Sequence, residues 1–205
     1  MERSPLVLVI DPGHGGADGG ANVGNVFESS LNLSIALKLD SIMGLFAVPT
    51  VLTRTGEDIE YPPEANTIRA KKVFDTKRRV KLIESIPNSV LISIHQNKFP
   101  DDYPHGAQSF YSRNPGSEEL AKNTQKLLVK ILDPQNKREA REIYSGVYLM
   151  KSVSCPSILV ECGFLSNPRE LALLQTEEYQ TKTAVCLSAA FLNTCDILEE
   201  VNGKG

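Results

Sequence analysis

The sequence predicts an α/β protein that forms a single domain of three layers, with a mostly parallel, twisted sheet of about six strands and helices on both faces. Short apolar runs alternate with longer amphipathic segments, which is the pattern of repeated βαβ units. The chain of 205 residues is long enough to bury one well-filled core. No internal repeat, low-complexity tract or linker divides residues 1–205, so we expect one domain.

Strands are predicted where short apolar runs stand between turn residues, at 5–10, 47–53, 89–95, 106–112, 146–150 and 157–161. Apolar side chains recur every three or four positions in four other segments, which predicts helices over 31–46, 69–83, 120–131 and 183–198. Pro168 is expected to start a further short helix, because proline is favoured at the first helical position. The charged, non-periodic segment 133–144 is expected to be an exposed connection.

The composition argues against several classes of function. The formal net charge of −3 is unlike the strongly basic balance of a dedicated nucleic-acid binder. No apolar stretch approaches the roughly 20 residues that a spanning helix needs. The N-terminus lacks the features of a signal peptide, and we expect that a native signal peptide or anchor has been removed. The four cysteines lack CxxC spacing and are expected to be small buried hydrophobes: Cys155, Cys162, Cys186 and Cys195.

Polar side chains stand at the ends of three predicted strands. His14 follows the run 6–10, His95 closes the run 89–95, and Glu161 ends the run 157–160. In an open α/β sheet, residues that leave the carboxyl ends of parallel strands converge on one crevice, where ligands bind. Two imidazoles and a carboxylate at that edge are the parts of a metal hydrolase.

A glycine-rich loop surrounds the first histidine, in the sequence Asp11-Pro-Gly-His-Gly-Gly-Ala-Asp-Gly-Gly-Ala21. A phosphate-binding loop is the obvious alternative, but the GK[ST] signature is missing and the loop holds no basic residue. Glycine at this density permits unusual backbone geometry, which fits a metal ligand that is held in place.

Each remaining candidate has a structural alternative. Glu28 heads the first predicted helix, where a surface carboxylate also gains from the helix dipole, and spacing alone favours that interpretation. A lone histidine such as His95 is more often a core or loop residue, although its pairing with His14 favours a site. Glu161 follows three aliphatic residues, and a buried ion pair would explain it as well as a catalytic role does.

Together His14, Glu28 and His95 make a set of two imidazoles and one carboxylate with a fourth position open for water. That set is typical of catalytic zinc rather than of a closed structural zinc site. No HExxH motif is present, so the three ligands come from separate segments of the chain.

Taken together, the motifs resemble those of the zinc-dependent N-acetylmuramoyl-L-alanine amidases, the Amidase_3 family. The similarity runs through IDPGHGGADGGA, the helix headed by Glu28, LTRTGED, SIHQN and LVECGFLSNPRE, which covers nearly the whole chain. The resemblance implies a peptidoglycan hydrolase that cuts between the lactyl group of muramic acid and L-alanine. It implies Zn²⁺ held by His14, Glu28 and His95, with Glu161 as the catalytic carboxylate.

The segment that follows His95 is most similar to the sporulation and germination branch of that family. This implies action on the cortex of the spore, where a deacetylase then helps to form muramic-δ-lactam. It also implies an extracytoplasmic location, a peptidoglycan substrate and, as an open alternative, a protein activator. The loops are short, so we expect no inserted helix over the zinc. Two rivals remain, another zinc amide hydrolase (a peptidase or deacetylase) and a wall-binding module that has lost catalysis.

Some residues keep two interpretations. Asp11 and Asn97 are candidates to support the metal-bound histidines or to contact substrate, because such histidines usually donate their second N–H to a partner; Asp11 is equally suited to cap its loop. His105 is expected to be a surface histidine, with substrate contact as the alternative. The basic stretch 69–81 is either a solvated face or a contact for the anionic stem peptide or an acidic partner.

Overall fold

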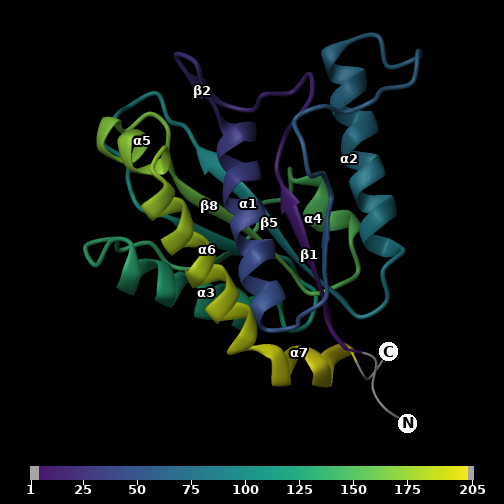
Figure 1. Cartoon of the computed structure of the whole chain (residues 1–205), viewed down its shortest axis with the longest axis vertical. Coiled ribbons are helices and arrows are strands. Elements are labelled where there is room, and N and C mark those ends of the chain that lie inside the picture. The colour runs from purple at the N-terminus through teal and green to yellow at the C-terminus, as the bar shows by residue number, and fades with distance from the viewer. Residues whose placement is uncertain (1–4, 203–205) are drawn as a thin grey trace.

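The computed structural model describes residues 5–202, which form a six-stranded sheet with helices on both faces (Figure 1). The strands lie in the order β4 (Thr50–Leu52), β1 (Val7–Pro12), β5 (Ser89–Asn97), β8 (Ser157–Phe164), β6 (Gln108–Tyr111) and β7 (Arg141–Glu142). β4, β1, β5 and β8 are parallel, and β6 runs antiparallel to β8. The expected α/β class and mostly parallel sheet are confirmed.

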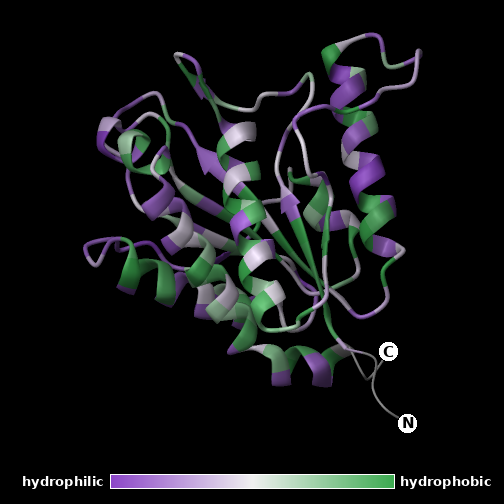
Figure 2. Cartoon of the chain, viewed as in Figure 1, coloured by the Kyte–Doolittle hydropathy of each residue, from purple (hydrophilic) through white to green (hydrophobic). Residues whose placement is uncertain are grey.

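The central strands are buried on both faces, as near-continuous apolar runs in parallel sheets usually are. Leu8 and Ile10 of β1 face the larger cluster, under α1 (Glu28–Leu45), α3 (Ser117–Ile131) and α6 (Glu177–Leu192). Val9 faces the smaller cluster, under α2 (Ile68–Glu84) and α4 (Tyr148–Ser152). α5 (Pro168–Leu174) and α7 (Cys195–Asn202) also contribute to the larger cluster. The colouring by hydropathy shows the apolar strands at the centre and many hydrophilic residues along α2 (Figure 2).

Local sequence signals explain where the helices begin. Pro168 occupies the first turn of α5, and the Asn167 side chain accepts hydrogen bonds from the backbone N–H groups of Arg169 and Glu170. The Thr67 hydroxyl accepts from Ala70 N at the start of α2. These side chains satisfy N–H groups that have no partner within the helix.

Two of the predicted elements were wrong. Segment 146–150 was expected to be a strand, but Tyr148–Ser152 is the short helix α4. A short apolar run does not distinguish a strand from a buried helical turn by periodicity, and Leu149 and Met150 reach the core as neighbours on one turn. The sixth strand is instead β7, inside the segment expected to be a connection; both of its residues are exposed, so no apolar alternation marked it.

Two further differences concern element boundaries. The last predicted helix is divided into α6 and α7 around Asn193 and Thr194, which are poor helix formers. The glycine-rich segment continues into a small antiparallel pair, β2 (Asn22–Val23) and β3 (Val26–Phe27), just before α1. The cysteines are free thiols, and three of them are buried as expected: Cys155, Cys162 and Cys186. Cys195 was also expected to be buried, but it is only half-buried. Over residues 5–202, no helix has the length and apolarity needed to cross a bilayer.

The packing of α1 yields a stability prediction. Leu39 of α1 is fully buried, whereas Leu45 at the end of the same helix is 84% exposed. Leu39→Ala should lower the free energy of unfolding by about 2–5 kcal/mol, because it removes buried methyl groups and leaves a cavity. Leu45→Ala is the matched control and should change it by less than about 0.5 kcal/mol. Urea unfolding measures both, and equal effects would contradict the described packing of α1.

Candidate metal centre

His14 lies in the loop that leaves β1, and its backbone has φ of 63°, in the left-handed region. For a residue other than glycine this conformation costs on the order of 1–3 kcal/mol and persists only where the surroundings impose it. The loop folds back through a bridge between Gly15 and Asp18. The unusual geometry expected around His14 is therefore present.

The side chains of His14, Glu28 and His95 meet at the carboxyl end of the sheet. One potential ligand atom from each lies within 4.8 Å of the others, and residues 5–202 contain no other such group of His, Cys, Asp or Glu. His14 Nε2 lies 3.3 Å from Glu28 Oε1, and His95 Nδ1 lies 3.0 Å from the same oxygen. The imidazole rings are edge to face, with centroids 5.0 Å apart. The predicted convergence of the two histidines is thus seen in the structure.

Strand order explains this convergence. β1 and β5 are neighbours and remain in register to Pro12 and Ile94, and Gly13 N donates to the Ile94 carbonyl oxygen. His14 and His95 therefore emerge from adjacent strands at the same edge of the sheet. Glu28 is the first residue of α1, which packs against β1 and β5. It is only 3% exposed, so the interpretation of Glu28 as a surface charge at a helix start was wrong.

Two glycines make room for the cluster. A Cβ atom at Gly13 would lie 2.3–2.7 Å from three atoms of the His95 ring. A Cβ atom at Gly20, where φ is +70°, would lie 2.5 Å from Glu28 Oε2. The glycine density of the loop is thus explained by close approach to the metal set, as well as by backbone conformation.

A carboxylate outside the set orients the His14 ring. His14 Nδ1 lies 2.9 Å from Asp18 Oδ2, which leaves Nε2 facing Glu28. Lys72 Nζ and Gly20 N donate to the other Asp18 oxygen. Imidazoles that bind metals usually have such a carboxylate on the second nitrogen. Asp18 was not among the predicted site residues; its position four residues after His14, inside the glycine-rich loop, was the available signal.

The Glu28 carboxylate is held by the backbone on both sides. Its Oε2 accepts from Ala21 N at 2.8 Å, and its Oε1 accepts from Gln96 N at 3.1 Å. Asn32, one turn further along α1, donates to the Gly13 carbonyl oxygen and also lies close to Glu28 Oε1. These contacts fix the carboxylate before any ligand arrives.

The cluster strongly favours a cation. Burial opposes protonation of His14, but hydrogen bonds to Asp18 and Glu28 outweigh it and raise the pKa of His14 to about 9. Burial alone would raise the pKa of Glu28, yet its contacts with His14 and His95 hold that pKa well below the usual range. A site that stabilises positive charge this strongly suits a divalent ion in place of the proton.

Glu161 stands beside this set, because it pairs with His95 across β5 and β8. Its Oε2 is one of three buried side-chain atoms among the described residues for which no hydrogen-bond partner is found. Burial raises the pKa of Glu161 to about 7, His95 and His14 oppose this effect, and Glu28 adds to it. Among residues 5–202 no basic side chain forms an ion pair with Glu161, and its unpartnered Oε2 can therefore contact a ligand or a water molecule.

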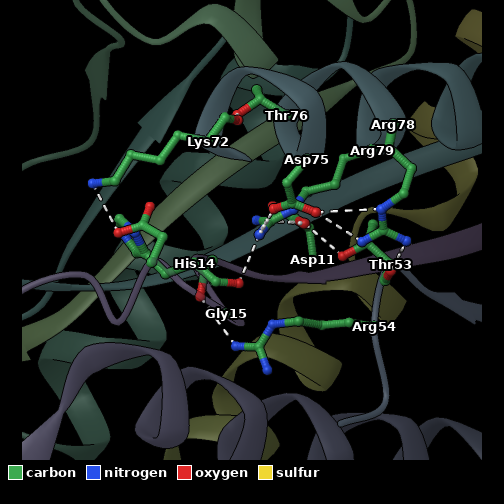
Figure 3. Close-up of polar contacts among 12 residues, drawn as sticks. Asp11, His14, Gly15, Thr53, Arg54, Lys72, Asp75, Thr76, Arg78 and Arg79 are labelled. Atoms are coloured by element: carbon green, nitrogen blue, oxygen red, sulfur yellow. Dashed lines mark hydrogen bonds and ion pairs between the residues drawn. The ribbon is translucent and has the colours of Figure 1, made fainter. Parts of the chain in front are cut away.

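Asp11 and Asn97 lie elsewhere in the network. Asp11 is buried and accepts hydrogen bonds from the Thr53 and Ser93 hydroxyls. It also pairs with Arg79, and Figure 3 shows Asp11 between Thr53 and Arg79. It thus joins the ends of β1, β4 and β5 without a hydrogen bond to either imidazole. The Asn97 side chain accepts from Lys98 N, after a register shift between His95 and Asn97 that interrupts the strand alternation.

The two histidines of the metal set, His14 and His95, line a cavity of about 280 Å³. His14 and His95 keep 25% and 19% of their side chains exposed, so part of each imidazole ring is open to solvent. The walls come from α2 and α4, including Lys72, Thr76 and Tyr148. His105 lies outside this cavity, half exposed and 3.1 Å from Asp133.

Comparison with known proteins identifies a family. A family model described as N-acetylmuramoyl-L-alanine amidase matches residues 8–193. The germination-specific N-acetylmuramoyl-L-alanine amidase of Bacillus subtilis is 37% identical over 185 residues, which cover 90% of this chain and 77% of that protein.

Solved structures show the same relationship. The CwlD amidase from Clostridioides difficile, in complex with the GerS lipoprotein, superposes with a TM-score of 0.89 at 35% identity, covering 94% of this chain and 99% of that one. The amidase AmiC2 of Nostoc punctiforme superposes with a TM-score of 0.76 at 27% identity, covering 92% of this chain and 96% of that one.

The packing of Gly13 against His95 generates a prediction. Gly13→Ala should displace the His95 ring and weaken zinc binding by at least about tenfold, the loss typical when a metal-ligating histidine loses its support. Gly44→Ala is the matched control, because a Cβ atom there meets nothing within 4 Å. Competition with a chromophoric chelator measures both affinities. Wild-type affinity in Gly13→Ala would show that the ring position does not matter for the metal.

Proposed function

The chain belongs to the N-acetylmuramoyl-L-alanine amidases, a family of zinc enzymes, and from this membership we propose the reaction and its residues. The substrate is the amide bond between the lactyl group of N-acetylmuramic acid and L-alanine of the stem peptide. His14, Glu28 and His95 hold the zinc, and Glu161 is the catalytic carboxylate. The main support for this proposal is that those three side chains converge beside Glu161, whose Oε2 atom has no hydrogen-bond partner. We assign this activity to residues 1–205 as one catalytic domain.

The donor set fits zinc in number, chemistry and spacing. Two imidazole nitrogens and one carboxylate oxygen, with a position left open, are typical of catalytic zinc. Tetrahedral ligands about 2.0–2.1 Å from zinc lie about 3.3 Å from one another. The separations of 3.3 Å and 3.0 Å between Glu28 Oε1 and the two imidazole nitrogens are close to that value.

Glu161 is proposed to move the proton of the reaction. Bound zinc supplies Lewis-acid chemistry, since it polarises the amide carbonyl and makes water more acidic. The Glu161 carboxylate takes a proton from the attacking water and passes it to the alanine nitrogen, which leaves poorly unless protonated. Burial raises the pKa of Glu161 above the usual range of a glutamate, which favours a group that both accepts and releases a proton.

Glu161→Gln tests this role. The variant should keep zinc, because Glu161 is not one of the three proposed ligands, and should lose turnover by about 100-fold or more. Release of free L-alanine amino ends from purified muropeptides, without new reducing sugars or acetate, measures the amidase reaction and separates it from the rival hydrolases. Acetate or internal peptide cleavage instead would refute the proposed reaction. Wild-type turnover by Glu161→Gln would show that Glu161 has no catalytic role in this reaction.

The proposed setting is the spore cortex. Family membership implies action on the cell wall, outside the cytoplasm. The 37% identity to a germination-specific amidase and the close structural match to CwlD support the cortex as the specific substrate. In that setting, removal of the stem peptide precedes deacetylation and formation of muramic-δ-lactam.

A protein partner is also proposed, because the similar CwlD amidase was solved in complex with the GerS lipoprotein. The basic surface of α2 is a second candidate for recognition of anionic groups. Its residue Lys72 lines the cavity at the metal set, and Lys77 and Lys81, which are neighbours at i and i+4, are exposed on another side of the same helix. We propose that this surface attracts the carboxylates of the stem peptides.

Charge reversal on α2 tests that attraction. The double variant Lys77→Glu with Lys81→Glu should bind intact peptidoglycan several-fold more weakly, with a larger difference at low salt than at high salt. Lys126→Glu with Lys130→Glu, at the same spacing on exposed positions of α3, is the matched control. Co-sedimentation with purified sacculi measures both. Unchanged sedimentation of the α2 variant would refute attraction of the stem peptides. The alternatives would then be binding of an acidic protein to α2 or no binding role at all.

A further inference from the structure

Arg54 is a buried arginine that contacts the backbone beside two members of the metal set. It follows β4 in the chain, and its side chain is only 3% exposed. Its Nε donates to the Pro12 carbonyl oxygen at 3.1 Å, and its Nη2 donates to the Gly13 carbonyl oxygen at 3.1 Å. These carbonyl groups belong to the two residues that precede His14 in the chain.

The same guanidinium reaches the segment that carries the carboxylate ligand. Arg54 Nη2 also donates to the Ser29 carbonyl oxygen at 2.8 Å, one residue after Glu28, and Nη1 donates to Gly56 at 3.0 Å. Four of the five N–H donors of an arginine are therefore used on backbone carbonyl groups. One rigid fork thus joins the β1 loop to the start of α1.

Charge pairing does not explain why this arginine is buried. The Glu57 carboxylate is its ion-pair partner, but that carboxylate lies 3.8 Å away and is 44% exposed. Such a contact is weak, and burial disfavours the charged guanidinium. The hydrogen bonds to carbonyl groups are what offset the burial, so the position of Arg54 is tied to the backbone of the site.

The glycine loop is shaped around this contact. A Cβ atom at Gly15 would lie 2.8 Å from Arg54 Nε. On the other side, Arg79 Nη2 donates to the His14 carbonyl oxygen at 2.6 Å and pairs with Asp75. In Figure 3 the two arginines approach the loop of His14 from opposite sides.

We propose that Arg54 is a positioning residue that fixes His14 and Glu28 relative to each other, so that the metal set is assembled before the metal binds. Arg54 is not one of the proposed ligands and acts through the carbonyl groups that precede His14 and the one that follows Glu28. A lysine would not replace it, because one ammonium group lacks the planar fork that spans both segments. This inference rests on the proposed function, because it assumes that His14 and Glu28 bind zinc.

The test measures zinc affinity separately from activity. In Arg54→Ala the dissociation constant for zinc, from competition with a chromophoric chelator, should rise about 10- to 100-fold. Arg54→Lys should show a similar loss of zinc affinity. If Arg54→Ala does not fold, the lysine variant alone tests the inference. The absorption spectrum of the Co²⁺-loaded variants should shift, because the ligand geometry has changed. Added guanidinium ion, far below denaturing concentration, should restore part of the zinc affinity of Arg54→Ala.

Asn114→Ala is the matched control for a merely structural role. The Asn114 side chain also donates to two backbone carbonyl groups, those of Val153 and Cys155, near the end of β8 that is remote from Glu161. This variant should lower thermal stability and leave the zinc dissociation constant unchanged. Arg54 variants that lose stability yet keep wild-type zinc affinity and Co²⁺ spectrum would overturn the inference. Failure of the wild-type protein to bind zinc would instead refute the proposed function.

Discussion

One carboxylate between two imidazoles is the contact on which this site depends. Glu28 Oε1 lies within 3.3 Å of a nitrogen of both His14 and His95. The contact exists because β1 and β5 are parallel neighbours, so that their last residues leave the sheet side by side, and because α1 starts directly above them. Each of the three side chains is supplied by a different segment, and only the fold brings them together.

The surroundings of this contact are unusually polar for a buried region. Asp11, Asp75 and Arg79 form a buried ionic cluster beneath the loop of His14. Buried ion pairs of this kind contribute little net stability, because desolvation offsets most of their attraction. Apolar residues of similar size at these positions would give a fold of equal or greater stability. The buried ionic cluster and the left-handed backbone of His14 both lower stability. Such features are expected where the geometry of a functional site is maintained at the expense of stability.

The sequence was informative where function imposes a local pattern. The glycine-rich loop, the histidines at strand ends and the aliphatic run before Glu161 each have a signature over a few residues, so the two histidines, Glu161 and the parallel sheet could be predicted. Glu28 has no such signature, because its position at a helix start favours a surface charge, and only the family resemblance implied that it is a ligand. Arg54 and Arg79 could not be assigned a role in this way, because their carbonyl partners lie 41 and 65 positions away in the chain. The strand predicted at 146–150 failed for a similar reason. Whether Leu149 and Met150 extend or coil is decided by the core they enter, not by their own spacing.

The central claim is that three distant side chains hold one zinc ion next to Glu161. An anomalous difference map from crystals of the protein, recorded at the zinc absorption edge, tests it directly. The account predicts a single strong peak about 2.0–2.2 Å from ligand atoms of His14, Glu28 and His95. A peak at other residues, or no peak in protein that was saturated with zinc, would contradict it.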